Sequence, residues 1–369
     1  MSERADVLVV GGGVMGCATA FYLAGLGVKV HILERDSIGS QASGVAAGLL
    51  YPLSESGQDD PEFKLSMLGQ MEHRRLAQEL LEETGIDVGF APLSDLRLAL
   101  DAEEESPLRQ LVAWHKEHNI AASWVSPDDL HRLEPRITSD ALGAFCLEDQ
   151  AQVDSFSLVM ALGQACKRRH VQVIRGEATG VNTQGSRIRG VVTHSGFMEA
   201  EQFVFALGPW SYRLESWLGV RVPVKPLRGQ ILTLQTQELA FHYAIHHQGN
   251  YVVSKASGEL IVGTTEEDAG FESTVTDDGK STIMYATKKI IPSLAQATIT
   301  GSRAGLRPVS ADGKPIIGQL TGWDNAFVMT GHGRKGILQS LPSAMAIAGL
   351  ATGKVSPIPL TDFAPGRFL

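Results

Sequence analysis

The chain has 369 residues, of which 43% are hydrophobic and 20% are charged, and its mean hydropathy is close to zero. This composition is typical of a soluble globular protein, and the length allows two or three domains of about 150 residues each. Thirty-two basic against 41 acidic residues leave a formal charge of −9, which disfavours nucleic acid as a partner because polyanion-binding proteins usually carry a basic face. The three cysteines are too widely spaced for a C-x-x-C metal site, so we expect no metal and a reducing compartment.

Residues 7–28 carry no charge, which superficially matches a membrane span or the core of a signal peptide. Six glycines interrupt this stretch, no positive excess precedes it, and no small-residue cleavage site follows it. A buried strand followed by a closely packed helix explains the pattern better. We therefore expect a cytoplasmic protein without a membrane span.

The N-terminal stretch predicts a βαβ unit. A β-rich run over residues 7–10 is followed by glycines, by an apolar helix over 14–26 and by a second strand over 28–33. A strand, a helix and a strand within about 30 residues indicate a parallel sheet.

The rest of the chain mixes helices and strands without an internal repeat or a flexible linker, so the domains are expected to interleave. Residues 36–60 are rich in Gly, Ser, Asp and Ala and indicate a long irregular functional loop. An amphipathic helix is expected over 62–83. Residues 171–206 and 228–264 are rich in strands, and a last helix over 337–350 follows a glycine-rich turn.

The sequence GGGVMG at residues 11–16 fits the G-x-G-x-x-G pattern. Gly11 permits the tight turn, Gly13 lets a pyrophosphate approach the backbone, and Gly16 lets helix and strand pack closely. The helix that follows presents unpaired N–H groups to the phosphates. Glu34, at the end of the next strand, can accept hydrogen bonds from a ribose diol. Together these features predict a dinucleotide site of the FAD or NAD type.

Two groups of ionisable residues receive no functional role. The acidic run at residues 103–105 is most simply a solvated face. His242, His246 and His247 have no fourth partner at a metal-ligand spacing and are expected in a loop.

Several further blocks occur in the order and spacing of a known group of enzymes. With residues 11–16 and 34–35 they are 42–50 (ASGVAAGLL), 206–211 (ALGPWS), 228–230 (RGQ), 251–253 (YVV), 262–265 (VGTT), 305–308 (GLRP) with 312–313 (DG), and 331–337 (GHGRKGI). On these blocks the chain resembles the amino-acid-oxidising flavoproteins of the D-amino acid oxidase superfamily, and within it the glycine oxidases.

The resemblance implies an α/β fold. It combines a Rossmann-type FAD-binding domain on a parallel sheet with an α+β substrate domain on a mostly antiparallel sheet. The FAD-binding domain is expected to be discontinuous, over residues 1–80, 145–225 and 300–369. The substrate-binding domain is expected over 81–144 and 226–299.

The resemblance also implies a cofactor, FAD, and its site. No histidine lies in residues 40–48 and no cysteine lies near the C-terminal turn, so covalent attachment is not expected. The helix near Ile337 would stabilise negative charge on reduced flavin through its N-terminus. Besides Gly11, Gly13, Gly16 and Glu34, the residues assigned to FAD are Val14, Met15, Arg35, Ala42, Ser43, Ala46, Ala47, Gly48, Leu49, Gly208, Trp210, Gly305, Arg307, His332, Gly333, Arg334, Lys335, Gly336 and Ile337.

Three of the matched positions are expected to be catalytic. Arg307 is the position that holds the substrate carboxylate, since a planar guanidinium makes two parallel charge-assisted hydrogen bonds to such a group. Tyr251 matches a tyrosine whose hydroxyl assists that binding. Arg334 matches a residue near both flavin and substrate.

The implied reaction is oxidative deamination of glycine or another small amino acid, such as sarcosine or D-alanine. Hydride passes from Cα to flavin N5, an imine leaves, and O2 is reduced to hydrogen peroxide. The expected partners are therefore the amino acid and O2, in a homo-oligomer.

Four alternatives stay open at this point. A dehydrogenase passing electrons to a quinone or protein acceptor shares every motif, and a flavin-binding protein without activity is the second alternative. An NAD-dependent dehydrogenase fits the N-terminal glycines but not the C-terminal turn. Arg303 and residues 331–333 also resemble the flavin domain of a bacterial tRNA-modifying enzyme, although the net charge of −9 disfavours tRNA.

Overall fold

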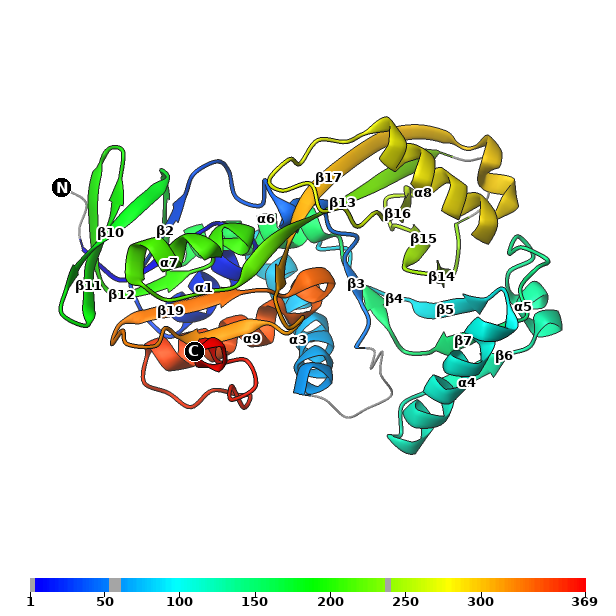
Figure 1. Ribbon diagram of the computed structural model, residues 1–369, viewed down its shortest axis with the longest axis horizontal. Coiled ribbons are helices and arrows are strands. Elements are labelled where there is room, and N and C mark those ends of the chain that lie inside the picture. Colours follow the sequence, from blue (N-terminus) through cyan, green and yellow to red (C-terminus); the bar gives the residue numbers. More distant parts are fainter. Residues whose placement is uncertain (1–3, 53–60, 236–239) are drawn as a thin grey trace.

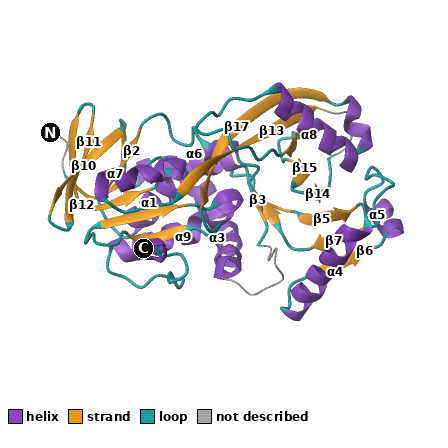
Figure 2. Cartoon of the chain, in the orientation of Figure 1, coloured by secondary structure: helices purple, strands orange, loops and turns teal. Residues whose placement is uncertain are grey.

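The computed structural model describes residues 4–52, 61–235 and 240–369. The molecule is elongated, with one sheet at the end where the N-terminus lies and a second sheet at the other end (Figure 1). Helices gather around the first sheet, and others lie beside the second sheet (Figure 2). No helix among the described residues combines the length and the apolar character needed to cross a membrane.

The first sheet has a parallel centre in the order β9-β2-β1-β12-β19. β18 pairs antiparallel with β19, and β10, β11 and β12 form an antiparallel meander. Its strands are β1 (Ala5–Val10), β2 (Val30–Glu34), β9 (Gln172–Arg175), β10 (Ala178–Gln184), β11 (Arg187–Thr193), β12 (Gly196–Phe205), β18 (Ile316–Gln319) and β19 (Ala326–Thr330).

Both faces of this sheet are buried, which explains the uninterrupted apolar run of β1. Val7 and Val9 belong to one core with four helices, whereas Leu8 and Val10 belong to a second core on the opposite face with α7 (Arg213–Leu218). The four helices are α1 (Val14–Gly25), α3 (Pro61–Thr84), α6 (Ser155–Arg168) and α9 (Gly336–Ala351). The predicted helices over 14–26, 62–83 and 337–350 are thus confirmed within two residues at each end.

The second sheet has the order β17-β13-β16-β15-β14-β5-β7-β6, and only the pairing of β14 with β5 is parallel. The predicted combination of a parallel sheet and a mostly antiparallel one is therefore confirmed. Its strands are β5 (Ser94–Ala99), β6 (Ala122–Val125), β7 (Gly143–Leu147), β13 (Val224–Gln235), β14 (Tyr243–His247), β15 (Asn250–Ser254), β16 (Leu260–Gly263) and β17 (Thr298–Ser310).

One face of the second sheet packs against two helices, and the other packs toward the glycine-rich loop and, at its β7–β6 end, against α4 (Ala102–Glu117). The first face shares a core with α5 (Pro127–Leu133) and α8 (Asp277–Ile290). On the second face Ile231, Tyr251 and Ile261 pack against Val45 and Ala47. This contact joins the two sheets through the segment that was expected to hold FAD.

The segment expected to be an irregular loop over residues 36–60 is irregular in its described part except for two short elements. α2 (Ala42–Val45) is followed by β3 (Leu49–Leu50), which joins β8 (Ala151–Gln152) and β4 (Ala91–Pro92) in a small third sheet. Residues 53–60 of that segment lie outside the described part of the chain. The remaining elements are α4 (Ala102–Glu117), η1 (Gly208–Tyr212), η2 (Pro292–Gln296), η3 (Gly333–Lys335) and η4 (Pro365–Phe368).

β13 and β17 pair along their lengths, from Val224 opposite Ser310 to Gln235 opposite Thr298. In Figure 1 these two long strands run from the region of the first sheet into the second. The division into 1–80, 145–225 and 300–369 against 81–144 and 226–299 stays a proposal.

Candidate active site

A cavity of about 790 Å³ is lined by residues of both sheets and of the glycine-rich segments. Every residue assigned above to FAD or to substrate lines it, with the single exception of Gly16. Sequence segments more than 300 residues apart therefore contribute to one site.

The cradle at the N-terminus of α1 depends on the absence of side chains. Gly11 has a φ of +112°, and a Cβ there would lie 2.3 Å from the carbonyl oxygen of Ala206. Gly16 faces away from the cavity, and a Cβ there would lie 1.8 Å from the carbonyl oxygen of Gly11. Only glycine allows this approach of helix and strand, so Gly16 shapes the cradle without lining it.

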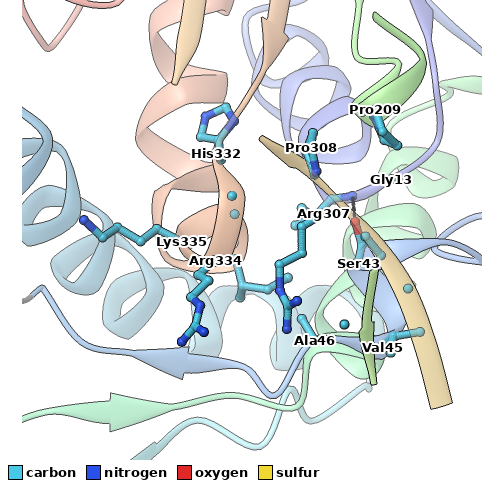
Figure 3. Close-up of a pocket in the computed structure, with 18 of the residues that line it drawn as sticks. Gly13, Ser43, Val45, Ala46, Pro209, Arg307, Pro308, His332, Arg334 and Lys335 are labelled. Atoms are coloured by element: carbon cyan, nitrogen blue, oxygen red, sulfur yellow. Dashed lines mark hydrogen bonds between the residues drawn. The ribbon is translucent and has the colours of Figure 1, made fainter. Parts of the chain in front are cut away.

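The first turn of α1 offers donors and a positive dipole end to the cavity. Its N-cap residue, Gly13, provides no side-chain cap, and the first turn contains no acidic residue. The N–H of Val14 donates to the Ser43 hydroxyl at 3.0 Å (Figure 3). A pyrophosphate fits such an end, because the N–H groups and the helix dipole both favour an anion.

Glu34 is fixed at the cavity wall by backbone donors. Its two carboxylate oxygens accept hydrogen bonds from the N–H groups of Gly12, at 2.6 Å, and Asp36, at 2.8 Å. Each carboxylate oxygen can accept a further hydrogen bond. The orientation of the Glu34 carboxylate therefore suits hydrogen bonds from a diol that lies against the same wall of the cavity.

The small-residue segment after α2 is held from two sides. A Cβ at Gly48, whose φ is +74°, would lie 2.1 Å from the carbonyl oxygen of Val153. The ammonium group of Lys255 donates to the carbonyl oxygens of Ala47 and Val153 and to Gln152 Oε1. Burial lowers the pKa of Lys255 to about 8. These contacts fix the backbone that lines the cavity between the two sheets.

The C-terminal turn directs the start of α9 toward the cavity. Gly333 has a φ of +52°, and the first turn of α9 has neither a side-chain cap nor an acidic residue. His332 is buried beside it and contacts the Ser343 hydroxyl through Nε2 at 3.1 Å. Burial lowers the pKa of His332 to about 3, so this histidine is neutral. The free N–H groups of α9 therefore carry the positive potential here.

Arg307 enters the cavity from β17. Leu306 is 3% exposed on the opposite face of the strand, as strand alternation predicts. The two terminal nitrogens of Arg307 donate to the Thr265 carbonyl at 3.1 Å and to Thr264 Oγ1 at 2.8 Å. A Cβ at Gly229 would lie 2.0 Å from Arg307 Nη1, so the guanidinium lies directly over that glycine.

The charge of Arg307 has no carboxylate at ion-pair distance anywhere in the described chain. Its partners are neutral oxygen atoms, and burial lowers its pKa. A half-buried guanidinium that lacks a counter-ion and lines a cavity is suited to bind an anionic ligand.

Tyr251 and Arg334 border the same part of the cavity, but Tyr251 is buried and Arg334 is half-exposed and ion-paired. Tyr251 on β15 is 8% exposed, and burial raises its pKa to about 12, so its hydroxyl remains a donor. Arg334 points in the same general direction as Arg307 in Figure 3. Its side chain is 45% exposed and is paired with Glu266 at 2.6 Å. Lys335 points away from both arginines in Figure 3, and its ammonium group lies 3.4 Å from Glu62.

Several residues at this end of the cavity were not predicted from the sequence. Tyr51, Arg97 and His246 line it and were given no role. The expectation that His246 and His247 lie in a loop was wrong, because both are in β14. This strand lies within the stretch 228–264 that was predicted to be rich in strands, but its position in the sheet depends on pairing with a segment about 150 residues away.

The expectation of a solvated face at residues 103–105 was also wrong for Glu104. Its carboxylate accepts from the N–H of Leu100 at 2.8 Å and lies 3.0 Å from His247 Nε2. It lines the cavity and joins the start of α4 to the end of β14.

No group of His, Cys, Asp and Glu among the described residues could hold a metal ion. The three cysteines are free and buried, and burial raises the pKa of each thiol.

The sequence matches the family DAO, FAD dependent oxidoreductase, over residues 6–350. The chain belongs to this family. It is 30% identical over 379 residues to glycine oxidase of Geobacillus kaustophilus (strain HTA426), covering 100% of this chain and 98% of the relative. It is 29% identical over 368 residues to glycine oxidase of Pseudomonas aeruginosa, covering 99% of each. The crystal structure of glycine oxidase from Geobacillus kaustophilus superposes with a TM-score of 0.96 at 29% identity, covering 100% of both chains.

Family membership makes the chain an FAD-dependent oxidoreductase. The uncapped start of α1, the glycine positions without room for a Cβ and the fixed carboxylate of Glu34 fit a dinucleotide at one end of the cavity. The start of α9 fits the flavin end, where negative charge needs a stabilising partner.

Proposed function

We propose that this enzyme catalyses the oxidative deamination of glycine or another small amino acid, such as sarcosine or D-alanine, with O2 as electron acceptor. The observation that carries the proposal is Arg307, a guanidinium without a carboxylate partner among the described residues, in the cavity that the dinucleotide cradle also lines. The similarity to glycine oxidases over the whole chain supports the same reaction.

FAD, when bound, would accept the electron pair from the amine-bearing carbon and pass it to O2, giving hydrogen peroxide. Arg307 holds the substrate carboxylate through two parallel hydrogen bonds, and Tyr251 donates a third from its protonated hydroxyl. Gly229 and Thr264 fix the guanidinium before substrate arrives. This preorganisation restricts which carbon of the substrate faces the flavin.

Further properties belong to the same proposal. We infer that FAD is bound non-covalently, that the enzyme is cytoplasmic and that it forms a homo-oligomer. Denaturation should release all of the flavin into the supernatant, and light scattering should give a mass above one chain. Flavin that stays with the precipitated protein would overturn the first point, and a monomer mass would overturn the last.

Oxygen uptake and peroxide formation over a panel of small amino acids of both hands test the function. The proposal predicts uptake with glycine, sarcosine or D-alanine and one peroxide for each O2 consumed. Flavin that bleaches with substrate under nitrogen and is not reoxidised by air would instead identify a dehydrogenase with another acceptor. Flavin unaffected by every amino acid would overturn the proposal.

A further inference from the structure

His246 lies beside the proposed carboxylate site and has no role in the scheme above. Its ring lies between two tyrosines, with centroids 5.8 Å from Tyr51 and 5.7 Å from Tyr251. All three residues line the cavity. His246 therefore borders the same space as Tyr251 from the neighbouring strand.

A buried carboxylate stands behind this histidine. Asp95 on β5 is fully buried, and its Oδ1 lies 3.1 Å from His246 Nε2. Its other oxygen accepts from Arg97 Nε at 3.0 Å, which fixes the carboxylate plane. Neither Asp95 Oδ1 nor His246 Nε2 makes a hydrogen bond among the described residues, so the 3.1 Å approach of the two atoms is an electrostatic contact.

This arrangement determines which ring nitrogen of His246 is left for a ligand. A carboxylate beside Nε2 favours the tautomer with the proton on Nε2, which leaves Nδ1 as an acceptor. Nε2 is sealed from solvent, yet 13% of the side chain remains exposed and the residue lines the cavity. Burial lowers the pKa of His246 to about 4, so the ring is neutral and can accept.

The cations around the cavity indicate which group of the ligand would lie next to the acceptor Nδ1 of His246. Arg97 is paired with Asp95, and Arg334 is paired with Glu266, which leaves Arg307 as the cation for the substrate carboxylate. The other polar group of an amino acid is its amine, which offers only N–H donors when charged. A neutral imidazole with a free acceptor nitrogen matches that group in hydrogen bonding.

We propose that His246 accepts a hydrogen bond from the amino group of the substrate and that Asp95 is a positioning residue acting through His246. The proposal rests on the proposed function, because it requires an amino acid whose carboxylate is held by Arg307. Arg307 on β17 then binds the carboxylate of the zwitterion, and His246 on β14 binds its amino group.

The test compares a ligand that has the amine with one that lacks it. Glycine affinity is taken from the concentration dependence of flavin reduction under nitrogen, and acetate affinity from its perturbation of the oxidised flavin spectrum. His246→Leu should weaken glycine binding about tenfold or more, as expected for a lost hydrogen bond to a charged group. Acetate, which has the carboxylate alone, should keep its affinity within about twofold. His246→Asn, whose amide oxygen lies near the former Nδ1, should restore most of the glycine affinity.

The Asp95→Asn variant tests whether Asp95 acts through His246. It should weaken glycine binding less than His246→Leu does, and it should add nothing in a His246→Leu background, since residues acting as one unit are non-additive. Independent effects of the two changes would show that Asp95 does not act through His246. Flavin content and thermal midpoint establish that each variant is folded.

Three outcomes overturn the assignment. Equal loss of glycine and acetate affinity in His246→Leu would mean that the residue only shapes the pocket. Unchanged glycine affinity would remove it from substrate binding while the proposed function stands. A wild-type enzyme that neither binds nor oxidises any small amino acid would overturn the proposed function, and this assignment with it.

Discussion

The two ends of the cavity are built in different ways. The nucleotide end consists of backbone N–H groups and glycines from residues 11–16, completed by Glu34 and the segment after α2. The substrate end consists of side chains from strands far apart in the sequence, such as Arg307 on β17 and His246 on β14. One end is therefore specified by local backbone geometry, and the other by the pairing of distant strands.

The most disruptive test of the nucleotide end is Gly16→Val. A Cβ at this position would lie 1.8 Å from the carbonyl oxygen of Gly11, and neither backbone segment can move without opening the β1–α1 turn. We expect a loss of more than about 3 kcal/mol of stability, the upper range for overpacking. The purified variant should contain little or no flavin, measured as flavin absorbance per chain, with or without added FAD.

Gly180→Ala is the matched control, because a Cβ there meets nothing within 4 Å. It should keep its flavin and its thermal midpoint. A Gly16→Val protein with full flavin content would show that the close approach of helix and strand is not what forms the cradle.

Arg307→Ala is the corresponding test of the substrate end. Losing the partner of a buried carboxylate should cost roughly 2–5 kcal/mol, equivalent to a rise in KM of about 30- to 5,000-fold. Steady-state oxygen uptake against glycine concentration measures it. Flavin content should not change, since the cradle at α1 is independent of this side chain. Arg303→Ala, an exposed arginine on the same strand, should leave KM within about twofold. A KM that does not respond to Arg307→Ala would remove Arg307 from the site.

The same contrast explains how much of the molecule was predictable from the sequence. The βαβ unit and the roles of Gly11, Gly16 and Glu34 follow from short-range patterns, because a strand, a turn and a helix that touch are neighbours in the chain. Arg307 was identified through a matched block, and strand alternation placed it opposite Leu306. That much of the site needs no knowledge of tertiary pairing.

His246 and Glu104 show where this reasoning ends. His246 enters the site because β14 pairs in parallel with β5, which sets it opposite Arg97 and near Asp95. Glu104 is shielded from solvent because the start of α4 lies against the end of β14. Neither contact has a local signature, since a pairing of strands about 150 residues apart depends on the packing of the whole chain.

Acidification should destabilise the fold through three buried neutral histidines. Burial lowers the pKa of His73 and His246 to about 4 and that of His332 to about 3. Between about pH 6.5 and 4 the unfolded chain binds protons at these rings and the folded chain does not, so stability falls as pH falls through this window. From pH 7 to pH 5 each contributes at most about 2 kcal/mol of loss.

Thermal midpoints at pH 7 and pH 5 measure this effect. His73→Gln should reduce the difference between the two midpoints, because it removes a buried titratable ring that lies 2.8 Å from the Ile337 carbonyl oxygen. His194→Gln, at an exposed position, should leave the difference unchanged. An unaltered difference in His73→Gln would show that its buried ring does not titrate as inferred.

Glu266→Gln should have the smallest effect and distinguishes the roles of the two arginines near the substrate. Arg334 and Glu266 form a half-exposed pair at 2.6 Å, and such pairs contribute only about 0–1 kcal/mol. The KM for glycine should therefore change less than about fivefold. Removing the carboxylate leaves Arg334 free beside the cavity, so a substrate with a second carboxylate, such as iminodiacetate, should gain affinity relative to glycine. Glu272→Gln, an exposed change in the same loop, should alter neither KM. A steep fall in glycine oxidation in Glu266→Gln, with no gain for iminodiacetate, would contradict this. It would show that Glu266 holds Arg334 against the glycine carboxylate. Arg307 and Arg334 would then share the binding of the substrate.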